Sequence, residues 1–190
     1  DVRVRQALNY GVNVEEIIRT VLEGHASRMP GPLIPINKHF DPSLKPYPYD
    51  PEKAKKLLRE AGYGKGLELT FHSCQGRYLK DQEFSQAIAA QLAKIGVNAK
   101  VRFHEWATYL DMVKGPTHGG PLHVMGRSDR ELEGGIMYAW FKTGATWVVF
   151  SDPEIDQELT KSMAIMNPSK RTEAFNKLQR RIQELAPWIF

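Results

Sequence analysis

The chain contains very little cysteine and no long hydrophobic run. Cys74 is the only cysteine among 190 residues, so no disulfide can form within the chain, and cysteine usage does not indicate a redox compartment. No stretch approaches the run of about 18 apolar residues that a membrane span requires. Cys74 follows an apolar stretch, and we expect it to be a small buried side chain.

Signatures of covalent, nucleotide and metal chemistry are missing as well. The sequence has no Gly-x-Ser-x-Gly elbow, no Walker loop, no Gly-x-Gly-x-x-Gly and no cysteine pair. Its six histidines include His118 and His123, which are close in sequence, and His72 and His104, which end two alternating stretches. No His-x-x-x-His or Cys/His set accompanies them, so we predict solvated or core histidines, no metal site and no cofactor.

Charge of one sign is not concentrated anywhere. The net charge is +4, and the lysines and arginines are scattered along segments that also carry glutamate. Nucleic-acid binding needs basic side chains clustered on one face, so we predict no nucleic-acid partner. With 42% hydrophobic and 25% charged residues, the chain can bury a core, and the default expectation is a single domain over residues 1–190.

The segment from Lys45 to Tyr63 specifies a helix at both ends. Asp50 can accept hydrogen bonds from the first-turn amides, Pro51 suits the first helical position, and Gly62 can adopt the left-handed conformation that ends a helix. The intervening apolar residues recur at helical spacing and predict one buried stripe: Ala54, Leu57, Leu58 and Ala61.

Two alternating stretches surround a second helix. Residues 67–72 and 97–104 alternate apolar and polar side chains, which predicts strands, and between them Asp81 is expected to cap a helix that Gly96 closes. This βαβ unit predicts an α/β fold with parallel strands and a right-handed crossover. Parallel strands covered on both faces are usually continuously apolar, so we expect one face of this sheet to be thinly covered or polar.

Other elements follow from local signals. A helix is expected from about Val4 to Tyr10, and Asn13 with Glu16 predicts a capping box for the next helix. Prolines crowd residues 29–48 and predict an ordered but irregular surface strap. Further elements are predicted in the second half of the chain: a strand at 122–125, an apolar segment at 136–141, and helices beginning at Asp152-Pro153 and Asn167-Pro168.

The candidate site is the polar loop that follows the strand at 122–125. Ligands of open α/β sheets bind at the carboxyl ends of the strands, and Gly126 there precedes Arg127, Ser128, Asp129 and Arg130. A peptide is a zwitterion, so Asp129 is suited to its ammonium and Arg127 or Arg130 to its carboxylate. The alternative is an exposed loop whose charges pair with one another. Four aromatic residues are a second candidate feature, as a stacking floor on which a ligand would lie, but we favour core packing for most of them: Trp106, Tyr138, Trp140 and Trp147.

Four segments in order resemble the extracellular solute-binding proteins of peptide and nickel ABC importers. They are DVRVRQALNYGVNVEEII, YDPEKAKKLLREAGY, QAIAAQLAKIGVNAKV with EWATYL, and an MG pair before an acidic loop. The resemblance implies one lobe of a two-lobed periplasmic-binding-protein type II fold, with βαβ units and a mainly parallel sheet flanked by helices. Residues 1–190 would be a partial lobe, without the companion lobe and the C-terminal return segment.

The resemblance also implies a function. Such a protein binds a small peptide or similar polar solute by hinge closure, delivers it to an ABC permease in the membrane and catalyses no reaction. It is exported to the periplasm or the extracellular space, with a signal peptide upstream of this fragment. In similar proteins a Gly-Trp pair precedes the acidic residue that holds the ligand's amino end. Here Arg127 follows Gly126 and Asp129 comes one residue early, which favours a more anionic ligand.

Three alternatives remain open. The first is a receptor lobe for a nickel chelate, glutathione, a sugar or another small polar solute. The second is a small α/β hydrolase or transferase that uses His104, Glu105 and Asp129 as acid and base groups, which would have to converge in one pocket. The third is a structural interaction module, in which residues 127–130 would line no cleft.

Overall fold

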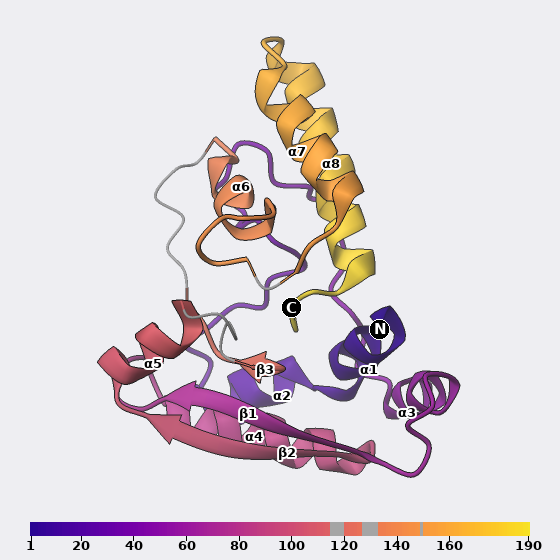
Figure 1. Cartoon of the computed structure of the whole chain (residues 1–190), viewed down its shortest axis with the longest axis vertical. Helices are drawn as coiled ribbons and strands as arrows, with labels where there is room; N and C mark the ends of the chain where they lie inside the picture. The colour runs from indigo at the N-terminus through magenta and orange to yellow at the C-terminus, as the bar shows by residue number, and fades with distance from the viewer. Residues whose placement is uncertain (115–119, 127–132, 149) are drawn as a thin grey trace. The chain divides into compact units, whose positions relative to one another are not determined.

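The computed structural model describes residues 1–114, 120–126, 133–148 and 150–190 (Figure 1). These residues fall into two compact units that are described separately. Unit 1 comprises residues 1–28, 47–126 and 189, and unit 2 comprises residues 29–46, 127–188 and 190. The predicted single lobe over residues 1–190 stays a prediction. None of the helices in the described ranges is long and apolar enough to cross a membrane.

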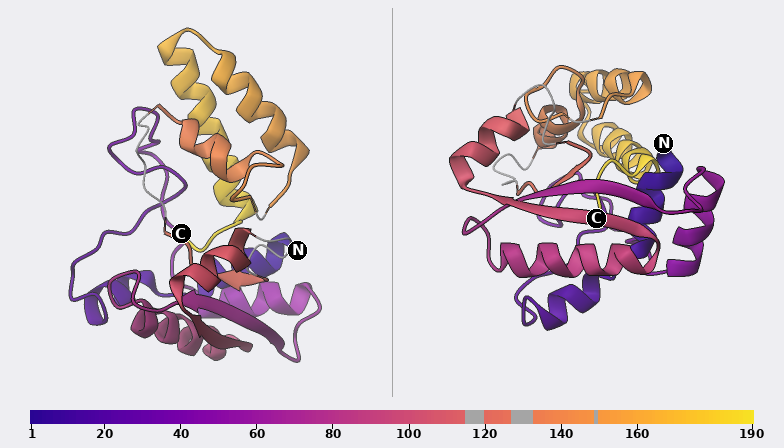
Figure 2. Two further views of the ribbon diagram at one scale, coloured as in Figure 1. Left: turned by 60° about the vertical axis from the view of Figure 1, so that its left-hand side comes forward. Right: turned by 60° about the horizontal axis from the view of Figure 1, so that its bottom comes forward.

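Unit 1 is built on a three-stranded parallel sheet with the order β2-β1-β3. Strand β1 (Leu67–Cys74) pairs along its whole length with β2 (Val97–His104), and the short β3 (Leu122–His123) pairs with the other edge of β1. Helix α4 (Asp81–Lys94) connects β1 to β2 and runs beside them in all three views (Figures 1 and 2). The predicted βαβ unit is therefore confirmed, and the predicted strand at 122–125 is shorter than expected.

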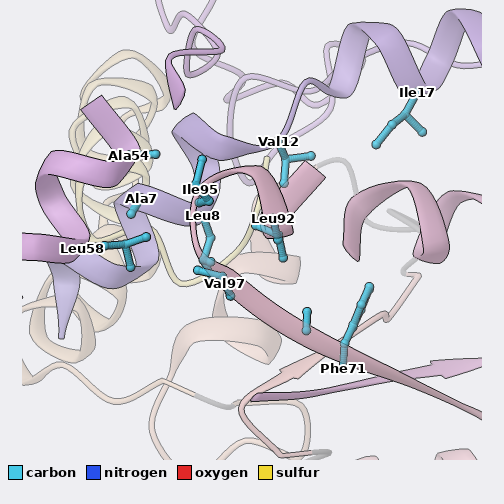
Figure 3. Close-up of a cluster of buried hydrophobic side chains, with 11 residues drawn as sticks. Ala7, Leu8, Val12, Ile17, Ala54, Leu58, Phe71, Leu92, Ile95 and Val97 are labelled. Atoms are coloured by element: carbon cyan, nitrogen blue, oxygen red, sulfur yellow. The ribbon is translucent and has the colours of Figure 1, made fainter. Parts of the chain in front are cut away.

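One face of the sheet carries the hydrophobic core of unit 1. Helices α1 (Val2–Gly11), α2 (Val14–Thr20), α3 (Pro51–Glu60) and α4 contribute side chains to it. Figure 3 shows the central side chains, which are fully or almost fully buried: Ala7, Leu8, Val12, Ile17, Ala54, Leu58, Phe71, Leu92, Ile95 and Val97. The apolar members of the alternating strands supply this face, as their period of two predicts.

The other face of the sheet is polar, as the alternation predicts. Glu68 and Lys100 are exposed and form an ion pair across β1 and β2, at 2.8 Å. Near the carboxyl ends of the strands, helix α5 (Trp106–Lys114) brings the buried side chain of Tyr109. Its hydroxyl donates a hydrogen bond to the backbone oxygen of Val124 and lies 3.4 Å from that of His72, which ties α5 to the strand ends.

The helix signals were correct in part. Asp50 accepts a hydrogen bond from the amide of Lys53 at 2.9 Å, and Gly62 has φ 92°, so both predicted ends of α3 are confirmed. Asn13 caps α2 through the amide of Glu16. The predicted capping box also requires the amide of Asn13 to donate to the side chain of Glu16. That amide donates instead to the side chain of Gln91 on α4, at 2.6 Å.

Unit 2 consists of helices and an irregular strap. Helices α7 (Pro153–Ala164) and α8 (Pro168–Leu185) lie side by side in every view, and α6 (Gly135–Phe141) precedes them (Figures 1 and 2). Both predicted Pro starts are confirmed by caps from Asp152 and Asn167. The inward side of α8 is buried: Phe175, Leu178, Gln179 and Ile182.

The strap of residues 29–46 is held against α8 by side-chain hydrogen bonds. Gln183 donates to the backbone oxygens of Pro30 and Lys45, and Gln179 donates to that of His39. The strap is irregular as predicted, but it is not only a surface feature. Several of its side chains are almost fully buried: Leu33, Asn37, His39 and Asp41.

Candidate functional site

The predicted site residues Arg127, Ser128, Asp129 and Arg130 lie outside the described residues, and their role stays a prediction. The carboxyl ends of β1 and β2 and the segment after β3 are described up to Gly126, the residue before that loop. The site can therefore be built from the groups that unit 1 places at this edge of the sheet, where ligands of open α/β sheets bind.

The loop between β1 and α4 is organised by one carboxylate. Asp81 is buried and accepts hydrogen bonds from the amides of Gly76, Arg77 and Tyr78, at 3.1, 2.8 and 3.0 Å. Asp81 was expected to cap α4, and that prediction is wrong. Lys80 occupies the cap position with φ 54°, so the Asp81 side chain turns back to the loop that precedes the helix. Burial raises the pKa of the Asp81 carboxyl, but these amide donors outweigh it and lower the pKa overall.

Arg77 is an exposed cation on an aromatic support. Its guanidinium carbon lies 5.0 Å from the ring centre of Trp106 and 5.5 Å from that of Tyr78. The two rings meet edge to face at 6.1 Å. Stacking of this kind holds a guanidinium in place while its N–H donors stay available. Within the described ranges no carboxylate forms an ion pair with Arg77.

Tyr78 also contacts Gly126, the last described residue before the predicted loop. The amide of Gly126 donates to the Tyr78 hydroxyl oxygen at 2.9 Å, and a Cβ atom at position 126 would lie 2.5 Å from the Tyr78 ring. This close approach requires a glycine at position 126. The contact places Gly126 beside the residues that hold Arg77.

A histidine pair lies near the carboxyl ends of β1 and β2. Nδ1 of His72 and Nε2 of His104 are 2.9 Å apart, and both side chains are half-buried. The pKa of His72 is lowered, mainly by burial and to a smaller extent by the neighbouring His104 and Arg102. Of the alternative acid–base set, Glu105 caps α5 by accepting a hydrogen bond from the amide of Ala107 at 2.8 Å, and Asp129 lies outside the described residues.

The predicted aromatic residues do not form one group. Trp106 belongs to the support for Arg77 in unit 1. In unit 2, Trp140 stacks on Trp147 with ring centres 5.7 Å apart and meets Trp188 edge to face, while Tyr138 is exposed. These contacts within unit 2 agree with the preference for packing over a stacking floor.

Sequence reasoning missed Arg77. The available signal was a Gly-Arg-Tyr run directly after a predicted strand, followed by Asp81. Exposed arginines are common, so this signal alone does not separate a site residue from a solvated one. For metals, the described part of the chain holds no group of three or more histidine, cysteine, aspartate or glutamate side chains suited to an ion.

Comparison with known proteins gives a consistent family assignment. The family described as "Bacterial extracellular solute-binding proteins, family 5 Middle" matches residues 1–144. Heme-binding protein A of Haemophilus influenzae is 32% identical over 195 residues, which cover 100% of this chain and 36% of that protein. Glutathione-binding protein GsiB of Pectobacterium atrosepticum is 30% identical, over 99% of this chain and 38% of its own length.

Solved structures agree. The periplasmic binding protein DppA of Helicobacter pylori, in complex with the peptide STSA, superposes with a TM-score of 0.90 at 26% identity. The match covers 100% of this chain and 38% of the DppA chain. A dipeptide-binding protein of Pseudoalteromonas in complex with Met-Leu gives a TM-score of 0.88 at 26% identity, over 98% and 38%. The chain thus spans less than two fifths of the length of these relatives.

Proposed function

The chain belongs to the bacterial extracellular solute-binding proteins of family 5, and we propose that it forms part of the solute receptor of an ABC importer, with a peptide as its cargo. Its α/β fold, a parallel sheet flanked by helices, is that of a lobe of such binding proteins. Members of the family act in the periplasm or outside the cell, and the same location is proposed for this protein.

The proposed mechanism is capture by closure. The solute binds between this lobe and a companion lobe, hinge closure removes it from water, and the closed receptor docks on a membrane permease. No bond of the solute is made or broken. Because the chain offers only one side of such a site, we expect the isolated chain to bind a peptide only weakly. Micromolar affinity of the isolated chain for a peptide in a calorimetric titration would contradict this expectation.

The observation that carries the proposal is the supported guanidinium of Arg77. It is exposed at the carboxyl edge of the sheet and held by Trp106 and Tyr78. A guanidinium binds a carboxylate through two parallel hydrogen bonds, and such charge-assisted bonds are about twice as strong as neutral ones. We assign to Arg77 the carboxylate of the peptide.

Residues 127–130, which lie outside the described residues, are proposed as further ligand-binding residues. Asp129 would accept the ammonium group of the solute, and Arg127 or Arg130 would bind a further anionic group, with Ser128 as a hydrogen-bond donor. Three arginines among the proposed ligand-binding residues favour a solute with more than one carboxylate. This makes a glutathione-like peptide a second candidate, supported by the similarity to the glutathione-binding protein.

The experiment is a calorimetric titration of the full-length receptor, after native mass spectrometry has identified a peptide that co-purifies with it. Arg77→Gln removes a charged hydrogen-bonding partner worth about 1.5–3 kcal/mol, so the Kd should rise by about 10- to 100-fold. Arg77→Lys keeps the charge without the planar fork and should lose less. Arg59→Gln, which changes an exposed arginine on α3, is the matched control and should leave the Kd unchanged.

Amidation of the peptide's C-terminus tests whether Arg77 contacts the peptide carboxylate directly or affects binding indirectly. The amidated peptide should lose affinity for the unaltered receptor and should lose no more for Arg77→Gln. Independent losses from the two changes would contradict the assignment of the carboxylate to Arg77. Failure of every peptide, with another solute co-purified, would contradict the proposed cargo.

A further inference from the structure

His72 and His104 are brought together by the register of two parallel strands. His72 pairs with Arg102, and Cys74 pairs with His104, so the two histidines are diagonal neighbours on the same face of the sheet. Their ring centres are 5.1 Å apart, and the planes are inclined by 33°. This face lies opposite the hydrophobic core of unit 1, and beside the pair it also carries the buried side chain of Cys74.

We propose that His72 and His104 form a two-histidine site for a divalent first-row transition-metal ion that imidazole binds with ligands at right angles: Cu²⁺ or Ni²⁺. The proposal is independent of the peptide-binding function. At metal–nitrogen distances of about 2.0–2.1 Å, two ligands at right angles have nitrogens about 2.9 Å apart. Nδ1 of His72 and Nε2 of His104 already have this separation, 2.9 Å.

The ion takes the place of the hydrogen shared by the two rings. In the metal-free protein one imidazole donates N–H to the other. Metal binding requires a lone pair on both facing nitrogens, so the donor ring changes to the tautomer that carries its hydrogen on the other nitrogen. Each ring then has to turn away from the line between the two nitrogens, so that its lone pair points to the ion. Protonation of either ring competes with the metal.

The groups around the pair define an open site of moderate affinity. On β2, Arg102 adds a positive charge that opposes a cation, and on β3 His123 lies opposite His72 in the register. From α5, the ring of Tyr109 lies 6.0 Å from that of His104. No further histidine, cysteine or carboxylate completes a set of three in the described ranges, so water fills the remaining coordination positions.

The structure also supplies a reporter. The ring of Tyr109 lies 6.0 Å from that of His104 and 6.1 Å from that of Trp106. The ring of Tyr109 thus lies between Trp106 and His104, one of the two proposed ligands. Because paramagnetic Cu²⁺ quenches nearby indole fluorescence, its binding should be visible through Trp106, and Trp106→Phe identifies the contribution of this tryptophan.

The test is a Cu²⁺ titration of the whole chain at pH 7.5, followed by fluorescence. We expect one ion per chain, with a Kd that rises at least tenfold in His72→Gln and in His104→Gln. His25→Gln, at an exposed histidine in a loop, is the matched control and should bind as the unaltered chain does. Arg102→Gln removes the opposing charge and should lower the Kd. At pH 5.5 binding should weaken.

Pulsed electron paramagnetic resonance of the copper-loaded chain is a second readout that does not depend on any variant folding. Modulation from two imidazole nitrogens is expected for one bound ion. A spectrum with one imidazole or none, no binding by the unaltered chain, or equal Kd values in His72→Gln, His104→Gln and the unaltered chain would each overturn the proposal.

Discussion

The amide of Gly126 donates a hydrogen bond to the Tyr78 hydroxyl oxygen, and there is no room for a side chain at position 126. A Cβ atom there would lie 2.5 and 2.8 Å from two ring carbons of Tyr78. Gly126→Ala must therefore displace the Tyr78 ring or the chain after β3. We expect a loss of about 1–3 kcal/mol in the free energy of unfolding, measured by urea denaturation, as for other overpacked sites.

Gly64→Ala is the control for Gly126→Ala. A Cβ atom at position 64 would meet Cγ of Arg59 at 3.2 Å, which is a flexible exposed side chain that can move aside. Its effect should stay within about 0.5 kcal/mol, as for most surface substitutions. Equal effects of the two substitutions would show that the close approach to Tyr78 is not what Gly126 is needed for.

Asp81→Asn should loosen the loop that carries Arg77. The amide side chain keeps the size of aspartate but replaces charge-assisted bonds from the amides of Gly76, Arg77 and Tyr78 with weaker ones. We expect a loss of about 1–3 kcal/mol in the free energy of unfolding at pH 7. Amide hydrogen exchange of residues 76–78 should also become faster than in the unaltered chain.

The pH dependence of the same substitution follows from the lowered pKa of Asp81. The folded state holds the carboxylate charged, so its contribution is fully present above the unfolded pKa of about 3.9 and is lost as pH falls through the lower folded pKa. The difference between Asp81→Asn and the unaltered chain should therefore shrink below about pH 4. A difference that stays constant down to pH 2 would contradict the role given to the charge.

Local sequence signals predicted most elements, and they failed where a partner is distant or a backbone conformation is unusual. The caps of α3 depend on neighbours within one helix, and they were correct; of its predicted stripe, Ala54 and Leu58 are buried and Leu57 and Ala61 are half-buried. The amide of Asn13 pairs with Gln91, 78 residues away, which no local pattern reveals. Aspartate is a common helix-capping residue, but the positive φ of Lys80 turns the Asp81 carboxylate toward the preceding loop.

The candidate site was harder to predict than the fold for the same reason. The period of two places His72 and His104 on one face, but their approach to 2.9 Å depends on the register between strands that are separated by a helix. The value of Arg77 as a binding group depends on Trp106, which comes 29 residues later, and on the lack of a carboxylate partner within the described ranges. Both are properties of the folded chain.

Cys74 should react very slowly with thiol reagents in the native protein. Its side chain is fully buried, and burial together with the charge of Asp81 raises the pKa of the thiol to about 11. Because the thiolate is the reactive form, almost none is available at pH 8. Reaction with Ellman's reagent should be complete within minutes in 8 M urea and strongly retarded without it. Rapid reaction of the folded chain would mean that the end of β1 opens readily.

His39 should make the stability of unit 2 depend on pH. Its side chain is 4% exposed, stacks on Phe175 with ring centres 4.8 Å apart and shares a hydrogen bond with Thr172 at 2.9 Å. Burial lowers the pKa of His39; Glu133 opposes this shift, while Arg171 and Lys38 add to it. The folded state therefore favours the neutral ring.

A lowered histidine pKa means that the unfolded chain binds the proton more tightly. The contribution of His39 to stability is then complete above its unfolded pKa of about 6.5 and decreases as pH falls from there through the folded pKa. The free energy of unfolding should fall between pH 7.5 and 5, and the decrease should be smaller in His39→Gln. His72, whose pKa is also lowered, adds a decrease of the same sign in unit 1. His25→Gln should keep the full slope, and an unchanged slope in His39→Gln would show that the buried ring is not the sensor.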